Sequence, residues 1–343
     1  MPENPTITVL MPVYNCEDYV KVAIESIINQ TYSNFEFLII DDASSDKTVS
    51  IIKSFEDPRI ILFEKSKNTG YTISLNYGLS IAKGRYIARM DADDISLPER
   101  LFKQLSYMES NPNTIVCGSF YEVIGNSEIR EFPVLDEDLK VNLLTQSCFA
   151  HPAVMIRKSV LDIHNIQYDQ SKEPAEDYAL WVSLLPFGVF HNLEDVLLKY
   201  RVHEHQVTNK RRKVQLESKL STRIKVLEYL DVTFNEASID VLKKILSFEK
   251  LELDEVLTFF ELKDKFIENN NRLLVFSKIE FTSYMDELEE KNLKLYFFKN
   301  PQFSMSIYKQ YLEIKKSRGF VLTTYEAFII FTKCVFRSKT LLN

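Results

Sequence analysis

Three aspartates stand close together in the segment Met90-Asp91-Ala92-Asp93-Asp94, directly after an apolar stretch of the chain. Carboxylates this close repel one another unless a cation neutralises them. Hard cations such as Mg²⁺ and Mn²⁺ prefer carboxylate oxygens and often keep coordination positions free for phosphate oxygens. The segment therefore indicates a divalent-metal site for a phosphorylated ligand. For an isolated D-x-D, the alternative interpretation is a solvated acidic turn or a helix cap.

Other polar side chains follow other apolar runs. The carboxylates of Asp41 and Asp42 can accept a hydrogen bond from a base N–H or a ribose hydroxyl. Tyr14 is either a half-buried strand residue or an aromatic ring that stacks on a nucleobase. By chemistry alone, residues 68–70 are only a turn, in which the final glycine is free to adopt positive φ.

Alternating strands and helices must position these side chains. The spacing of apolar residues predicts strands at 7–13, 35–40, 59–63 and 85–90, and helices at 18–29, 47–55 and 72–82. Such alternation is typical of βαβ units in a mostly parallel sheet. Ligands bind at the carboxyl ends of the strands in open α/β sheets. We therefore expect Asn15, Asp41, Asp42 and residues 91–94 to converge on one edge of the sheet.

The distribution of glycine and proline divides the chain into two parts. Six of the seven glycines lie between Gly70 and Gly188, and ten of the eleven prolines lie at or before Pro186. The remainder should be mostly helical, because these residues are the main helix interrupters. We predict one domain over residues 1–210 and a helical region over 211–343, whose role in acceptor binding, oligomerisation or membrane contact stays open.

Two stretches of the helical region have several interpretations. The basic run 210–213 is a solvated helix face, a clamp on an anionic acceptor or a membrane-surface contact. The aromatic stretch 325–337 is a packed core helix or a helix that lies at a membrane interface.

Composition excludes several classes of protein. The net charge of −7 argues against a nucleic-acid partner. The four cysteines are scattered and predict neither a zinc site nor a disulfide framework. The N-terminus lacks the apolar segment of a secretory signal, and no stretch reaches the roughly 18 apolar residues of a membrane span. We expect a cytoplasmic protein that at most touches the inner face of the membrane.

Taken in order, the motifs resemble glycosyltransferase family two, which has the GT-A fold. The resemblance rests on Pro12-Val13-Tyr14-Asn15, Gln30-Thr31-Tyr32, Ile40-Asp41-Asp42-Ala43-Ser44, Asn68-x-Gly70, Ala82-Lys83-Gly84-Arg85-Tyr86-Ile87 and Met90-Asp91-Ala92-Asp93-Asp94. Glu176-Asp177-Tyr178-x-x-Trp181 and Tyr200-Arg201-x-His203, followed by Gln206 and Thr208, extend it to residues 5–210. Nothing after residue 210 resembles a family motif.

The resemblance implies an α/β fold of GT-A type, with a mostly parallel, Rossmann-like sheet flanked by helices and a helical C-terminal extension. It also implies an inverting transferase that moves a sugar from a nucleotide diphosphate sugar, most often a UDP-sugar. The cofactor would be Mn²⁺ or Mg²⁺. The acceptor would be a saccharide or a lipid-linked saccharide in cell-surface glycan biosynthesis, an inference that rests on analogy within the family.

The resemblance also assigns roles to individual residues. Those expected to bind the nucleotide sugar are Pro12, Tyr14, Asp42, Asn68, Arg89, Asp91 and Ala92. Those expected at the metal are Asp93 and Asp94, with His203 as a further ligand or a diphosphate contact. One departure from the family is Leu75, which stands where many members carry a donor-binding arginine. Arg89 would supply that missing charge.

The acidic pair Glu176-Asp177 would carry the proton transfer. A sugar hydroxyl is a poor nucleophile at neutral pH, so a positioned carboxylate must take its proton. By the resemblance, Asp177 is that base and Glu176 the reserve. The structural alternative is a helix start, where acidic residues are favourable and Pro174 precedes the pair. The two interpretations are compatible, because a helix start holds a base rigidly.

Three other functions are weighed against this one. A sugar nucleotidyltransferase would need a glycine-rich phosphate loop after the first strand, yet the first glycine is Gly70. A hydride-transferring Rossmann enzyme would need G-x-G-x-x-G, which is absent from the sequence. A non-catalytic nucleotide-sugar-binding module would have lost metal or base residues, and both are present.

Overall fold

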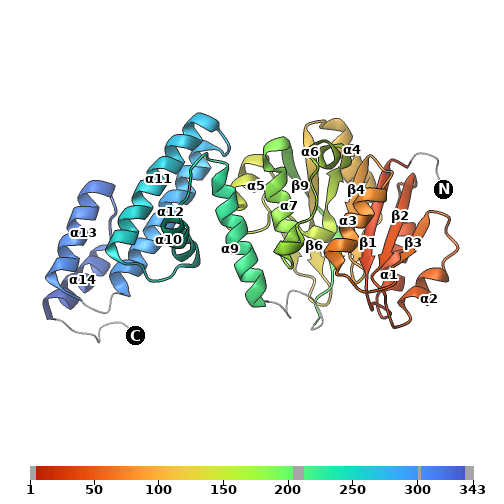
Figure 1. The fold of residues 1–343 in the computed structure, drawn as a ribbon, viewed down its shortest axis with the longest axis horizontal. Coiled ribbons are helices and arrows are strands. Elements are labelled where there is room, and N and C mark those ends of the chain that lie inside the picture. Colours follow the sequence, from red (N-terminus) through yellow and green to blue (C-terminus); the bar gives the residue numbers. More distant parts are fainter. Residues whose placement is uncertain (1–4, 204–211, 300–302, 337–343) are drawn as a thin grey trace. The chain divides into compact units, whose positions relative to one another are not determined.

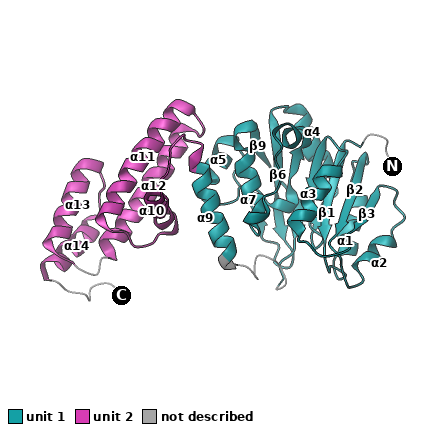
Figure 2. Cartoon of the chain, in the orientation of Figure 1, with its two compact units in different colours: residues 1–226 teal, residues 227–343 magenta. Residues whose placement is uncertain are grey.

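A computed structural model describes residues 5–203, 212–299 and 303–336. The chain forms two compact units, residues 1–226 and 227–343 (Figure 2). The domain boundary predicted at 210/211 lies at the end of a segment, 204–211, that is outside the described residues. The same holds for the side chains of the basic run 210–213 and for His205, Gln206 and Thr208.

The first four strands form the parallel half of the sheet (Figure 1). They are β1 (Ile7–Val13), β2 (Phe35–Asp41), β3 (Ile60–Glu64) and β4 (Tyr86–Arg89), and the intervening helices are α1 (Val20–Ile28), α2 (Thr48–Lys53) and α3 (Tyr71–Ile81). Their spatial order is β3-β2-β1-β4. Strands β1 and β2 are buried along their whole length, as expected for central parallel strands covered on both faces. The predicted α/β fold is confirmed, and these strands agree with it closely.

The second half of the sheet is mixed in direction. Its elements are β5 (Ile95–Ser96), α4 (Arg100–Ser110), β6 (Thr114–Val123), β7 (Ile129–Arg130), α5 (Asp136–Asn142), β8 (Met155–Arg157), α6 (Lys158–His164), α7 (Glu176–Leu184) and β9 (Val189–Tyr200), with short 3-10 turns at His151–Ala153, Gln170–Lys172 and Leu185–Phe187. Strand β8 pairs antiparallel with both β4 and β6, whereas β6 and β9 are parallel. The strand order continues β4-β8-β6-β9-β5.

Two buried polar side chains of α4 bind backbone carbonyls of β4, of β6 and of the segment that leads into β8. Arg100 is fully buried, and its Nη2 donates to the carbonyl oxygens of Arg89 (2.6 Å) and Val154 (3.3 Å). Gln104 Nε2 donates to the carbonyl of Ala153 (2.8 Å) and to that of Cys117 (2.9 Å). Buried polar groups are costly unless they are paired, so these bonds fix the end of β4 just before the acidic segment.

The C-terminal unit is helical, as the sequence predicts. The last helices are α9 (Arg212–Glu228), which contains the boundary between the units, α10 (Glu236–Ser247), α11 (Leu253–Leu273), α12 (Lys278–Phe298), α13 (Met305–Arg318) and α14 (Thr324–Phe336). Phe259, Phe266, Phe281 and Phe297 are buried in the second unit. Within the described ranges, no helix combines the length and the apolar character that a bilayer crossing requires.

Candidate active site

The loops that follow β1 and β2 are bound to each other. Asn15 Oδ1 accepts a hydrogen bond from the backbone N–H of Ser45 (2.8 Å), and the backbone N–H of Asn15 donates to Ser44 Oγ (2.9 Å). Tyr14, the residue before Asn15, has 47% of its surface exposed, so its ring is available to a ligand. The structure thus brings the first two strand ends together at one edge of the sheet.

Asp42 holds the loop after β3. One carboxylate oxygen accepts from Lys65 Nζ (2.5 Å) and from the backbone N–H of Thr69 (3.0 Å), and the other accepts from the backbone N–H of Gly70 (2.8 Å). Asn68 is exposed at the tip of this loop. The buried carboxylate therefore fixes the loop after β3, and its direct contact with a nucleoside stays a prediction. Lys65 belongs to none of the sequence motifs, so the sequence did not predict its contact with Asp42.

The three aspartates of the acidic segment form one cluster. Carboxylate oxygens of Asp91, Asp93 and Asp94 lie within 4.8 Å of one another. Arg89 makes an ion pair with Asp91. Burial raises the pKa of Asp93 and of Asp94, and the neighbouring Asp91 raises both further. The cluster thus concentrates negative charge that a single guanidinium does not balance.

The end of β9 closes over this cluster. Arg201 donates from its backbone N–H to Asp94 Oδ1 (2.8 Å) and from Nε to the carbonyl oxygen of Asp93 (2.8 Å). His203 Nε2 lies 2.9 Å from Asp93 Oδ2. Tyr19 supports both residues, because its ring lies 4.7 Å from the Arg201 guanidinium and 5.3 Å from the His203 ring. The structure therefore places His203 beside Asp93, as the sequence predicts, and adds Tyr19.

The acidic cluster fits a hard divalent cation. Asp94 is 1% exposed, and its Oδ2 has no hydrogen-bond partner within the described part of the chain. An unpaired buried carboxylate oxygen is costly, and a cation would satisfy it. Three carboxylates with an adjacent imidazole suit Mg²⁺ or Mn²⁺. The residues present could thus hold the predicted metal, and which ion they hold stays a prediction.

Glu176 begins α7 and is almost fully buried. Its Oε2 accepts a hydrogen bond from Tyr71 OH (2.6 Å), and its Oε1 lies 4.0 Å from Nδ1 of His151. His151 Nε2 in turn lies 2.8 Å from Tyr168 OH. Burial and the neighbouring Asp177 raise the pKa of Glu176 to about 8. Glu176 is therefore mainly protonated at neutral pH.

Asp177 is the more accessible of the two carboxylates. It is half-buried, and its Oδ2 accepts a hydrogen bond from Ser147 Oγ (3.4 Å). Burial raises its pKa, whereas the backbone N–H of Tyr178 and the positive charges of Arg89 and Lys219 lower it. Because Glu176 keeps its proton to about pH 8, Asp177 is the carboxylate that ionises first. Two carboxyl groups whose environments push their pKa values apart are typical of an acid–base site.

Arg89 links the acidic cluster to the carboxylate pair. It pairs with Asp91, and its charge counteracts the effect of burial on the pKa of both Glu176 and Asp177. Leu75, by contrast, is fully buried. The charge of Arg89 therefore acts on both groups of carboxylates.

The remaining predicted residues are buried beside the site. Pro12 lies within β1, paired with Ile40, and Ala92 is 4% exposed between Asp91 and Asp93. The roles of the predicted residues stay predictions. Residues that sequence reasoning missed are Tyr19, Lys65, Tyr71, Ser147 and Tyr168. Each makes a contact with a site residue at least 17 positions away in the sequence, and no local pattern encodes such a contact.

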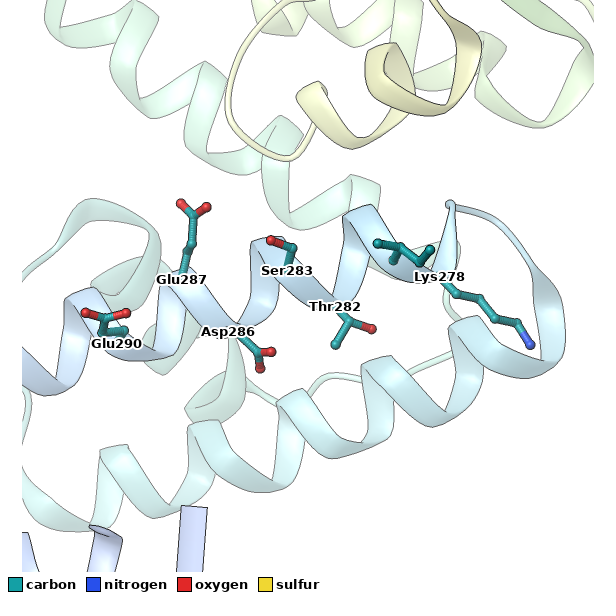
Figure 3. Close-up of a pocket in the computed structure, with 7 residues that line it drawn as sticks. Lys278, Thr282, Ser283, Asp286, Glu287 and Glu290 are labelled. Carbon is teal, nitrogen blue, oxygen red and sulfur yellow. The ribbon is translucent and has the colours of Figure 1, made fainter. Parts of the chain in front are cut away.

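A separate hollow of about 530 Å³ lies on α12 (Figure 3). It is lined by Lys278, Ile279, Thr282, Ser283, Asp286, Glu287 and Glu290. All of these residues come from one helix, and none is among the predicted site residues.

Comparisons with known proteins identify the family of the chain. The sequence profile described as "Glycosyl transferase family 2" matches residues 8–162. An uncharacterised glycosyltransferase of Haemophilus influenzae is 30% identical over 314 residues, which cover 81% of this chain and 97% of that protein. The Escherichia coli protein WfgD, a UDP-Glc:α-D-GlcNAc-diphosphoundecaprenol β-1,3-glucosyltransferase, is 31% identical over 206 residues, 59% of this chain and 79% of its own length.

A solved structure shows the same fold. TarS 1–349 of S. aureus, in complex with UDP-GlcNAc, superposes with a TM-score of 0.58. The match covers 85% of this chain and 93% of TarS 1–349, at 17% sequence identity. The predicted GT-A fold with a helical C-terminal region is therefore confirmed.

Proposed function

Because the chain belongs to glycosyltransferase family 2 and is a glycosyltransferase, we propose that it transfers a sugar from a nucleotide diphosphate sugar, with inversion, to a lipid-linked saccharide. UDP is the proposed carrier, since the relative WfgD is named for a UDP-sugar and TarS is crystallised with one. The proposed acceptor class follows from the diphosphoundecaprenol acceptor in the name of WfgD.

The donor half of the proposed site combines an aromatic ring with the acidic cluster. Tyr14 would stack on the base, and Asp93, Asp94 and His203 would hold Mn²⁺ or Mg²⁺. The metal would neutralise charge on the departing diphosphate. Arg89 and Arg201 would stabilise the same charge from fixed positions, which costs no reorganisation during the reaction.

The acceptor half is the carboxylate pair at the start of α7. Asp177 would take the proton of the acceptor hydroxyl as that oxygen attacks the anomeric carbon. Attack from the face opposite the diphosphate inverts the anomeric centre. Glu176 would stay protonated beside it, which keeps a second negative charge away from the reacting groups.

The position of Arg89 carries the proposal. A metal cluster and a base act on one substrate only if they face the same space, and Arg89 contacts Asp91 while its charge reaches Glu176 and Asp177. A structural ion pair at a strand end would need no influence on α7. This electrostatic link supports a two-sided transfer site over an acidic turn and an unrelated helix start.

Donor turnover tests the proposal. The full chain is incubated with Mn²⁺ and a panel of nucleotide sugars, and the released nucleotide is measured. We expect one donor to be bound and consumed, and turnover to stop when a chelator removes the metal. If no nucleotide sugar binds in the presence of metal, the proposed function is wrong.

Replacement of Glu176 by Gln should change the pH profile of transfer more than its maximum. Wild-type transfer should rise with pH as Asp177 ionises and should fall again near pH 8, where Glu176 loses its proton. Gln mimics the protonated carboxyl group, so the alkaline decline should disappear while transfer at pH 7 stays within roughly threefold of wild type. The measurement is the rate of nucleotide release across the pH range.

The control for this variant is Glu137→Gln, which changes an exposed glutamate of α5. This control should keep the wild-type pH profile. An alkaline decline near pH 8 that persists in Glu176→Gln would show that another group causes it.

A further inference from the structure

The outward face of α14 is entirely uncharged. Tyr325, Phe328, Val335 and Phe336 are exposed and recur with Thr332 at helical spacing, and Phe331 flanks them. Tyr325, Phe328 and Phe336 each expose more than 60% of their surface, at 71%, 63% and 73%. A surface helix of a globular protein normally presents charged residues to water. This helix presents aromatic rings instead.

The charged residues of α14 lie on its inner side. Lys333 is buried, with its Nζ 4.7 Å from the centre of the Phe303 ring. Glu326 accepts a hydrogen bond from the backbone N–H of Thr323 (2.9 Å) and lies 3.6 Å from Lys294. The distribution of polarity is thus inverted, and most of the surface of three aromatic rings lies outside the packing of the unit.

Helix α13 adds cations beside this face. Met305, Lys309, Leu312 and Lys316 are exposed and share one face at helical spacing, so apolar and basic side chains alternate there. The ring of Tyr308 on α13 lies 5.1 Å from the ring of Phe331, edge to face, which joins the two helices at the border of the aromatic face. We call these exposed residues of α13 and α14 the aromatic–basic surface.

The local charge helps to decide which binding partner fits this surface. The exposed charged residues of α13 and α14 are Lys309, Lys315 and Lys316 with one carboxylate, Glu313, a net charge of +2, whereas the whole chain carries −7. Lysines are depleted in interfaces between protein chains, which disfavours a second copy. Aromatic rings, short apolar side chains and peripheral lysines are the composition of helices that lie in the headgroup region of anionic bilayers.

We propose that the aromatic–basic surface binds the surface of an anionic lipid bilayer. Tyr325, Phe328 and Phe336 insert into the boundary between headgroups and acyl chains. Lys309 and Lys316 extend their methylene stems along the apolar surface and place their ammonium groups among the lipid phosphates. The biological use of this contact rests on the proposed function, because a lipid-linked acceptor lies in such a bilayer. The contact itself does not depend on that function.

Vesicle sedimentation of the full chain tests the proposal. The protein should pellet with vesicles of phosphatidylglycerol and phosphatidylcholine in equal parts and pellet less with phosphatidylcholine alone. The combined replacements Tyr325→Ser, Phe328→Ser and Phe336→Ser should weaken partition into the anionic vesicles at least about tenfold. The matched control is Ile279→Ser, which removes an exposed apolar side chain of α12 that lies outside this surface.

A second pair of variants tests the charges. Lys309→Glu with Lys316→Glu should reduce binding to anionic vesicles by at least about fivefold for each lysine and leave binding to phosphatidylcholine unchanged. Lys265→Glu, at an exposed lysine of α11, is the control. Melting temperatures of all variants should match wild type, since every changed side chain is exposed.

Two outcomes would overturn the proposal. The first is a wild-type chain that does not pellet with anionic vesicles. The second is a wild-type dimer that the aromatic replacements dissociate while vesicle binding is unaffected, which would identify the surface as an interface between copies. Nucleotide release from the donor without vesicles should be equal in wild type and in the aromatic variant. Failure of vesicle binding and failure of the transferase function are therefore separable.

Discussion

Asp177→Asn should abolish sugar transfer and leave donor binding intact. The amide has nearly the same shape as the carboxylate, so the hydrogen bond from Ser147 and the start of α7 should persist. What is lost is the ability to take a proton, and general bases contribute about 10²–10⁴-fold to rate. We expect the rate of transfer to fall about a thousandfold or more, with the dissociation constant of the donor changed by less than roughly threefold.

The measurements are single-turnover transfer for the chemical step and calorimetric titration for donor binding. Asp162→Asn, at an exposed aspartate of α6, controls for the substitution itself and should retain wild-type rates. Transfer that stays within tenfold of wild type in Asp177→Asn would remove Asp177 as the base. In that case Glu176 would be the next residue to test.

Asp93→Ala should remove the dependence of donor binding on metal. Asp93 offers a half-buried carboxylate that contacts His203 and shares the cluster with Asp91 and Asp94. Without it, the cluster loses a ligand and His203 loses its partner. Since disturbance of even the groups that support metal ligands costs about 10–100-fold in affinity, we expect Mn²⁺ to bind at least about a hundredfold more weakly.

Two readouts check this prediction without any transfer reaction. Free Mn²⁺ is measured by electron paramagnetic resonance during titration, and nucleotide binding is measured with and without the metal. Asp138→Ala, at an exposed aspartate of α5, should behave as wild type in both. A variant at Asp93 whose nucleotide binding still strengthens with Mn²⁺ to the wild-type extent would exclude Asp93 as a metal ligand.

We propose that Arg89 supplies the charge of the arginine that the family resemblance leads us to expect at the position of Leu75. Leu75 is fully buried, whereas Arg89 ends β4 directly before the acidic segment. Its carbonyl oxygen is held by Arg100, so the charged side chain projects from a fixed point of the backbone. A cation delivered from a central strand is rigid, which suits the stabilisation of charge that develops on a leaving diphosphate.

The sequence by itself determined the parallel half of the sheet and the location of its acidic motif. Apolar runs such as 7–13 and 35–40 are local and continuous, because central parallel strands are buried on both faces. Strand β1 was predicted without error, and β2 ends only one residue beyond its predicted end. The motif at residues 91–94 could also be recognised locally, because its carboxylates are neighbours along the chain.

Only the tertiary structure decided which distant residues complete the site and which face of α14 is exposed. Tyr71 reaches Glu176 across 105 positions, and Ser147 reaches Asp177 across 30. Such contacts depend on strand order and on the reversal of β8, neither of which leaves a periodic pattern in the sequence. The aromatic stretch 325–337 could be read as core or as interface, because periodicity shows that a helix has two faces without showing which is covered. Packing covers the face with Ile330 and Lys333 and leaves the rings of the other face exposed.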